Sequence, residues 1–161
     1  MIRQFEIGDL GGSIDLLIAT YNREPWNDSW TKESARAYLT EFINSSRFVG
    51  FVIDDDGVIV AASFAHARTW AGGNELYIDE FFVSPTHQGK GLGKQLMSAI
   101  TKYATDLRLA DIVLLTDNDK PAFDFYKALG FGYSGRQVLM SKSVKNSIAD
   151  PVTDDPNTHL G

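Results

Sequence analysis

A glycine-rich stretch is the part of the sequence whose residue types and spacing most directly suggest chemistry. It reads Gln88-Gly89-Lys90-Gly91-Leu92-Gly93, between an apolar run that stops at Pro85 and an amphipathic segment that begins at Leu92. Glycines in such a loop let successive backbone N–H groups point into one concave site beside a helix N-terminus. The spacing therefore predicts a phosphate-binding loop.

The same spacing excludes two common nucleotide loops. Ser84 stands where the first glycine of a P-loop would be, and Gly91 stands where its Ser or Thr would follow the lysine. Lys94 stands where the third glycine of the dinucleotide fingerprint would follow Gly89 and Gly91. The loop is therefore expected to bind a phosphate group in another way.

Two adjacent acids precede the loop, Asp79 and Glu80 in the apolar run 75–83. Acidic side chains in so apolar a strand are costly to bury unless they are paired or functional, so we expect at least one to line a wet cleft. Alternation along a strand points them to opposite faces, which predicts that only one faces the cleft directly. The alternative is that either acid pairs with a nearby arginine such as Arg68.

The elements that must position these residues are expected from periodicity and turn residues. Strands are predicted in 2–6, 48–53, 58–69, 75–83, 111–116 and 137–143, and helices in 10–21, 31–44, 92–107 and 122–129. An Asp-Gly pair at 56–57 predicts a hairpin, and the helix after the glycine loop predicts that 111–116 runs parallel to 75–83. One domain over 1–143 and a polar C-terminal tail over 144–161 are expected.

Composition and charge exclude several functional classes. The chain has 161 residues, 43% of them hydrophobic, and no cysteine, which excludes disulfides and thiolate chemistry. Three separated histidines show no metal-ligand spacing, so no metal is expected. The net charge of −6 disfavours nucleic acid and anionic membranes as partners. Without a basic and apolar leader or a long apolar run, we expect a cytoplasmic protein.

With the elements in this order, the loop resembles a known one. Gln88, Gly91 and Gly93 fit Q/R-x-x-G-x-G/A and resemble the acyl-CoA-binding motif of the GNAT superfamily of N-acyltransferases. The element order over 1–143 and the run FYKALGF at 125–131 are also similar to that superfamily. The resemblance implies a mixed α/β (α+β) fold: a mostly antiparallel twisted sheet of about seven strands, splayed at the acetyl-CoA site, with helices on both faces.

The resemblance also implies acetyl-CoA as co-substrate and a set of residues that bind it. These are Phe82, Val83, Gln88, Gly89, Lys90, Gly91, Leu92, Gly93, Lys94, Asn118 and Tyr126. Tyr126 stands where many of these enzymes carry the tyrosine that protonates the leaving thiolate, and the alternative is a core side chain. Asn118 resembles the family residue that bonds the pantetheine arm, with a plain turn residue as the alternative. Lys90 and Lys94 either reach phosphates or are solvated.

Acyl transfer to an amine needs a base, because only about one alkylamine molecule in 2,500 is neutral at pH 7. The segment 78–82, Ile-Asp-Glu-Phe-Phe, resembles aminoglycoside 6′-N-acetyltransferases, in which the acid after Ile contacts the drug amine and is the proposed base. Asp117 has a counterpart there as an acceptor-binding acid, and the Trp26 and Trp30 loop is loosely similar. Asp79, Asp117, Trp26 and Trp30 are therefore expected to bind the acceptor.

The expected function is direct acetyl transfer from acetyl-CoA to a primary amine of a cationic small molecule, an aminosugar ahead of a polyamine. Tyr126, Asp79 and Glu80 are the expected catalytic residues. Two alternatives stay open, acetylation of a protein or peptide amine and a non-catalytic acyl-CoA-binding sensor. A homodimer is neither indicated nor excluded.

Overall fold

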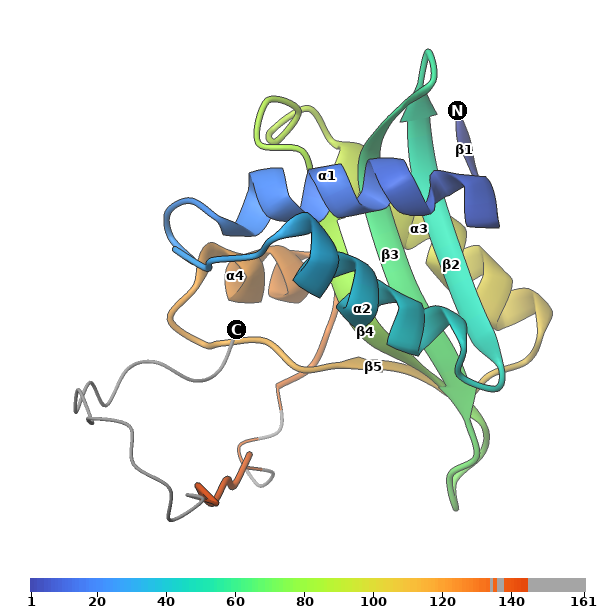
Figure 1. Cartoon of the computed structure of the whole chain (residues 1–161). Helices are drawn as coiled ribbons and strands as arrows, with labels where there is room; N and C mark the ends of the chain where they lie inside the picture. Colours follow the sequence, from blue (N-terminus) through green and yellow to red (C-terminus); the bar gives the residue numbers. More distant parts are fainter. Residues whose placement is uncertain (134, 136–137, 145–161) are drawn as a thin grey trace.

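The structure, a computed structural model, describes residues 1–133, 135 and 138–144 (Figure 1). Its elements in chain order are β1 (Ile2–Gln4), a 3-10 turn (Ile7–Asp9), α1 (Leu10–Tyr21), α2 (Lys32–Ile43), β2 (Phe48–Asp55), β3 (Val58–Arg68), β4 (Glu75–Val83), α3 (Leu92–Asp106), β5 (Asp111–Leu114) and α4 (Pro121–Ala128). In this part of the chain, no helix combines the length and the apolar character that crossing a membrane requires.

The strands form one mixed sheet in the order β1-β2-β3-β4-β5. Neighbours from β1 to β4 are antiparallel, and β5 is parallel to β4, as the crossover through α3 predicts. β5 pairs with β4 only as far as Ile78, whereas β4 continues to Val83. The second half of β4 therefore has no β5 partner among the described residues. The splay at the acetyl-CoA site stays a prediction.

Helices cover both faces of the sheet, as expected (Figure 1). On one face, α1 and α2 pack over a cluster that includes the fully buried Leu17 and Phe64. On the other face, α3 packs over a second cluster, which contains Leu76 of β4 and Ile100 of α3 itself. Tyr126 of α4 packs against the same cluster. The last half of β4 thus lies between the ends of α1, α3 and α4.

Local signals in the sequence account for the ends of several elements. Asp56 and Gly57 have positive φ, 50° and 85°, in the predicted hairpin turn. The Thr31 side chain accepts a hydrogen bond from the Ser34 N–H at 3.1 Å and caps α2. α4 begins with Pro121 in its first turn, and Gly130 follows it with a φ of 91° as the predicted cap.

The expectation of about seven strands is wrong for the part of the chain that the structure describes, which has five. In the predicted strand 137–143, Gln137 lies outside the described residues and 138–143 form no strand. Val138 and Met140 are 75% and 87% exposed there. Strand propensity reflects packing against neighbouring strands, and these side chains have none to pack on. β5 also ends at Leu114, two residues earlier than predicted.

Candidate active site

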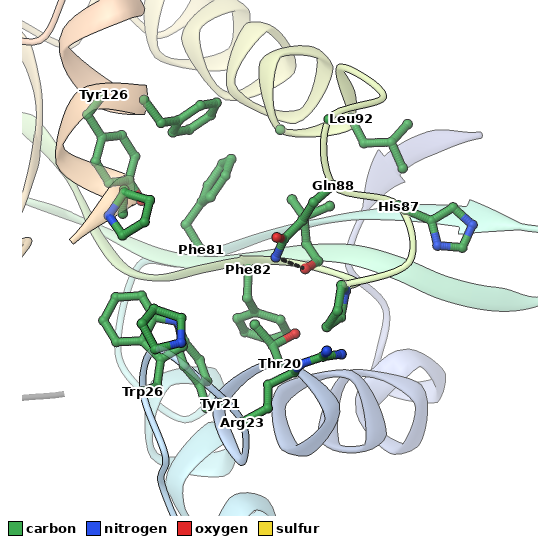
Figure 2. Close-up of a pocket in the computed structure, with 18 of the residues that line it drawn as sticks. Thr20, Tyr21, Arg23, Trp26, Phe81, Phe82, His87, Gln88, Leu92 and Tyr126 are labelled. Carbon is green, nitrogen blue, oxygen red and sulfur yellow. Dashed lines mark hydrogen bonds between the residues drawn. The ribbon is translucent and has the colours of Figure 1, made fainter.

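The glycine loop has a backbone that only glycine adopts readily. Gly89 and Gly91 have φ of 75° and 81°, and Gly91 is the N-cap of α3 without any side-chain cap among the described residues. The first N–H groups of α3 are thus open to an anion. Gly93 brings the start of α3 close to α4, because a Cβ there would lie 3.0 Å from Cζ of Phe125. Gln88 Nε2 donates to the Val83 carbonyl at 3.2 Å (Figure 2).

A cavity of about 630 Å³, which we call the loop cavity, lies between this loop, the end of β4, the end of α1 and α4 (Figure 2). Most residues predicted to bind acetyl-CoA line it: Phe82, Val83, Gln88, Gly89, Gly91, Leu92, Gly93, Lys94 and Tyr126. Lys90 and Asn118 are exposed and do not line it. Arg23, which sequence reasoning missed, lines it together with Lys94, His87 and one acid, Glu24. Open amides and two cations suit phosphate groups.

A second cavity of about 850 Å³, which we call the acid cavity, lies on the other side of Trp26 and Tyr126. Its lining includes four carboxyl groups: Asp28, Asp79, Glu80 and Asp117. No Lys, Arg or His from the described residues lines it. Trp30, Tyr38 and Tyr77 add aromatic faces. All four residues expected to bind the acceptor are therefore brought together, in a cavity suited to a cation.

The two cavities share a wall. Five residues line both of them: Tyr21, Trp26, Phe81, Ala122 and Tyr126. Figure 2 shows Tyr21 and Trp26 on one side of this junction and Tyr126 on the other. A group bound in one cavity can thus meet a group bound in the other at these side chains.

A β-bulge in β4 changes the predicted direction of the acids. Glu80 pairs with Phe64 and Ile78 with Ala65, so Asp79 is an extra residue in β4. Because the bulge interrupts the alternation, Asp79 and Glu80 both line the acid cavity. The expectation that only one of them faces the cleft is wrong.

Two tyrosines hold the Glu80 carboxyl group. Tyr21 Oη donates to Oε2 at 2.9 Å, and Tyr38 Oη donates to Oε1. Burial raises the pKa of Glu80, and the two tyrosine hydrogen bonds oppose this rise. Glu80 is thus a partly buried acid whose donors are neutral.

The Asp79 carboxyl group has a different partner. His66 Nδ1 lies 2.7 Å from Asp79 Oδ2, and burial raises the pKa of Asp79 while the contact with His66 lowers it. The alternative pairing with Arg68 is not found, since Arg68 Nε donates instead to the buried Glu75. Both acids on the bulge therefore remain available to a ligand of the acid cavity.

Tyr126 is at once a packing residue and a cavity residue. Its ring lies 5.5 Å from that of Phe131 and 6.0 Å from that of Phe81, centroid to centroid. Burial, and then the charge of Glu80, raise its pKa well above the ordinary value. The phenol is thus kept protonated at the junction of the cavities, and the core and acid interpretations do not exclude each other.

Sequence reasoning missed Tyr21, Tyr38 and His66. The two tyrosines belong to the apolar stripes of their helices, and periodicity does not separate a core tyrosine from one whose hydroxyl meets a carboxylate. His66 stands within the predicted strand 58–69, where nothing in the sequence marks it as the partner of Asp79. No local signal identifies these partners, because each contact joins two elements.

Comparisons with known proteins identify the family of this chain. The chain matches the acetyltransferase (GNAT) family over residues 15–131. It is similar to thialysine N-epsilon-acetyltransferase of Bos taurus, with 35% identity over 142 residues that cover 81% of this chain and 82% of that protein. It is also similar to mycothiol acetyltransferase of Arthrobacter sp. (strain FB24), with 32% identity over 119 residues, 70% of this chain and 36% of that protein. The chain thus spans about a third of that longer relative.

Solved structures show the same fold. Aminoglycoside N-acetyltransferase AAC(6')-Iy in complex with CoA superposes with a TM-score of 0.71 at 21% identity, covering 89% of this chain and 95% of that one. The matched residues 15–131 include the second half of α1, all of α2 to α4, the glycine loop and the junction of the two cavities. The chain therefore belongs to the GNAT family of acetyl-CoA-dependent acetyltransferases.

Proposed function

We propose that this enzyme transfers the acetyl group of acetyl-CoA directly to a primary amine of a cationic small molecule, such as an aminosugar or a polyamine. The observation that carries the proposal is a pair of cavities that differ in charge and meet at Tyr21 and Tyr126. Arg23 and Lys94 line the first together with one acid, Glu24, whereas the charged residues that line the second are all acids among the described residues. Arg23, Lys94 and the open amides of α3 suit the phosphates of acetyl-CoA, and the four carboxyl groups suit an ammonium ion. Acetyl-CoA supplies the activated acetyl thioester.

Charge in the acid cavity favours an acceptor without a carboxylate. Asp28, Asp79, Glu80 and Asp117 line it without a cationic side chain among the described residues. The carboxylate of an amino acid would therefore be repelled, whereas each added ammonium group gains a charge-assisted hydrogen bond. The Bos taurus relative is named for a thialysine amine, which makes an amino acid side chain the second candidate.

Glu80 is the favoured base. It is bonded to Tyr21, which lies at the junction, and its charge acts on Tyr126. Asp79 is instead held by His66, farther along the acid cavity, and suits contact with the acceptor ammonium. In the proposed step, Glu80 takes a proton as the amine nitrogen bonds to the acetyl carbon. A raised pKa makes its carboxylate a better proton acceptor.

Tyr126 is the proposed acid. As the bond between the acetyl carbon and sulfur breaks, the phenol gives its proton to the leaving sulfur, so no covalent enzyme intermediate is needed. Tyr126→Phe keeps the ring packing and removes only the hydroxyl. Turnover is expected to fall by roughly 10²–10⁴-fold with little change in acetyl-CoA affinity. Unchanged turnover together with lower thermal stability would make Tyr126 a core residue only.

The acceptor is tested by following thiol release from acetyl-CoA with a panel of amines. The panel contains spermidine, an aminoglycoside, thialysine, a neutral amine and a peptide with a free amine. We expect the two polycations to give the highest kcat/KM. Preference for thialysine would favour the second candidate, and acetylation of the peptide alone would favour a protein substrate. Acetyl-CoA binding without acetylation of any amine would favour a sensor.

The acetyl-CoA site is tested separately with Gly91→Val. No protein atom lies within 4 Å of a Cβ at this position, so a clash with the protein is not expected, but the φ of 81° is unfavourable for valine. The side chain would also occupy space beside the open amides of α3. Calorimetric titration should show acetyl-CoA affinity reduced at least roughly tenfold, as expected for a disfavoured backbone. Wild-type affinity in a folded variant would remove the loop assignment.

A further inference from the structure

Glu80 is hydrogen-bonded by two residues that have no step of their own in the proposed acetyl transfer. Tyr21 of α1 and Tyr38 of α2 donate to different oxygens of its carboxyl group. The carboxylate is thus held from both helices at once, and its direction is set by two donors that cannot lose their protons near neutral pH. Tyr21 also lines the loop cavity, whereas Tyr38 lines only the acid cavity.

Tyr38 is itself held in place. Its ring lies 4.8 Å from that of Trp30 and 4.8 Å from that of Phe42. Trp30 is tied to the end of α1, because Asn22 Nδ2 donates to its carbonyl and its N–H donates to Asn22 Oδ1, both at 2.8 Å. The indole Nε1 also donates to Asp28 at 3.0 Å. The α1–α2 connection therefore leaves the Tyr38 hydroxyl little freedom.

From this geometry we propose that Tyr38 is a positioning residue that acts through Glu80, aiming the carboxylate at the acceptor amine and holding it in its ionised form. The inference rests on the proposed function, in which Glu80 is the base. Tyr21 does the same from the opposite side and belongs also to the junction. Trp30 acts on Glu80 only indirectly, by holding the Tyr38 ring.

Several charged and titratable groups face Glu80 from the elements around it. Tyr21 from α1, Asp28 from the α1–α2 connection, Tyr38 from α2 and Asp79 from β4 act on Glu80 directly, and Glu80 acts on Tyr126 from α4. Tyr77 from β4 and Asp117 after β5 line the same cavity. His66 and Arg68 from β3 act on Glu80 indirectly, through Asp79. Asp79 and Asp28 raise the pKa of Glu80, whereas the hydrogen bonds of Tyr38 and Tyr21 lower it. Loss of the Tyr38 hydroxyl should therefore leave Glu80 protonated to a higher pH.

The test compares Tyr38→Phe with Tyr103→Phe. Both changes remove one tyrosine hydroxyl and keep the ring, but Tyr103 lies on α3 and packs against Phe51, 5.6 Å away. For Tyr38→Phe we expect kcat at pH 7 to fall roughly tenfold, the factor that matches one hydrogen bond to a charged group. The acid limb of the kcat profile should move to higher pH, so that activity recovers by pH 9. A rise in acceptor KM at every pH, with kcat unchanged, would make Tyr38 an acceptor contact instead.

A second measurement does not depend on activity. In protein labelled with ¹³C-glutamate, the Glu80 carboxyl signal is the one that Glu80→Gln removes. Its titration midpoint should be higher in Tyr38→Phe than in the wild-type protein and unchanged in Tyr103→Phe. An unchanged midpoint in Tyr38→Phe overturns the inference even where Glu80→Gln is inactive. A wild-type protein that acetylates no amine overturns the proposed function, while the titration still decides the role of Tyr38.

Discussion

Two groups of carboxylates in this protein have opposite surroundings. Near the N-terminus, Arg3 donates to Asp9 from Nη1 and Nη2, at 2.6 and 2.9 Å, and from Nη2 to Asp54 at 3.1 Å. These three residues, which we call the N-terminal cluster, tie β1 to the start of α1 and to the β2–β3 turn. On the bulge of β4, the donors to Glu80 among the described residues are tyrosines, and Asp79 has His66.

The balance between burial and the hydrogen-bond partners decides in which direction each pKa moves. Hydrogen bonding to Arg3 is the main reason that the pKa of Asp9 is lowered, and the Gly57 N–H and then Arg3 lower that of Asp54. Burial is the main reason that the pKa values of Asp79 and Glu80 are raised. A guanidinium fixes a carboxylate in its charged form and serves stability. Neutral donors leave a buried carboxyl group able to take up a proton.

The largest expected effect comes from removing a charge in each group by the same chemical change. Glu80→Gln should lower kcat by roughly 10²–10⁴-fold, because the amide cannot accept the proton of the amine. Asp9→Asn should leave kcat, measured per folded molecule, at the wild-type value. Steady-state assays at pH 8 with the preferred amine check both. A similar loss in both variants would mean that Glu80 serves the fold rather than the reaction.

The second effect concerns stability, which the change at Asp9 is expected to lower and the change at Glu80 is not. Asp9→Asn should lower the free energy of unfolding by about 1–2 kcal/mol, because it breaks the paired hydrogen bonds to a charged partner. Glu80→Gln should not lower it, since the amide oxygen and nitrogen can still bond the two tyrosine hydroxyls and a buried charge is removed. Urea titrations of the three proteins at pH 7 measure the difference. Equal stability of Asp9→Asn and wild type would show the N-terminal cluster to be dispensable.

The third effect is a pH dependence of opposite sign. The lowered pKa of Asp9 means that its stabilisation is complete above its ordinary value of 3.8 and is lost as the pH falls through the native value. The raised pKa of Glu80 means that stability decreases as the pH rises from its ordinary value of 4.5 through the native value. Melting temperatures between pH 3 and 8 should thus show Asp9→Asn less acid-sensitive than wild type. Glu80→Gln should gain stability mainly at the alkaline end, and a gain confined to acid pH would contradict the raised pKa.

The smallest effect expected is that of salt. The acid cavity is lined by carboxyl groups and, among the described residues, by no cationic side chain, so raising the salt concentration from about 0.05 to 0.5 M should raise the acceptor KM severalfold. The acetyl-CoA KM should rise less, because backbone amides contribute to that site. Asp117→Asn should reduce the salt dependence of the acceptor KM and leave kcat nearly unchanged. A salt effect on acetyl-CoA alone would mean that the acceptor is not bound by charge.

Much of the fold, and the loop half of the site, could be predicted from the sequence. The glycines at 89 and 91, the Asp-Gly hairpin, the Thr31 cap and the parallel β5 all depend on one residue or on neighbours along the chain. A positive φ or a helix cap depends on the local backbone conformation, which favours particular residue types, so the residue type at that position predicts it. The predicted residues 88, 89 and 91–94 accordingly line one cavity.

Only the tertiary structure decided how the acids of β4 are used. The bulge at Asp79 turns both acids to one cavity, Tyr21 and Tyr38 reach Glu80 from two helices, and Arg68 pairs with Glu75. The segment 138–143, β-prone by composition, forms no strand. The sequence by itself determined where the acidic, aromatic and glycine residues stand and at what spacing the apolar residues recur. Their partners depend on elements far apart in the chain, and contacts of this kind do not leave a local pattern.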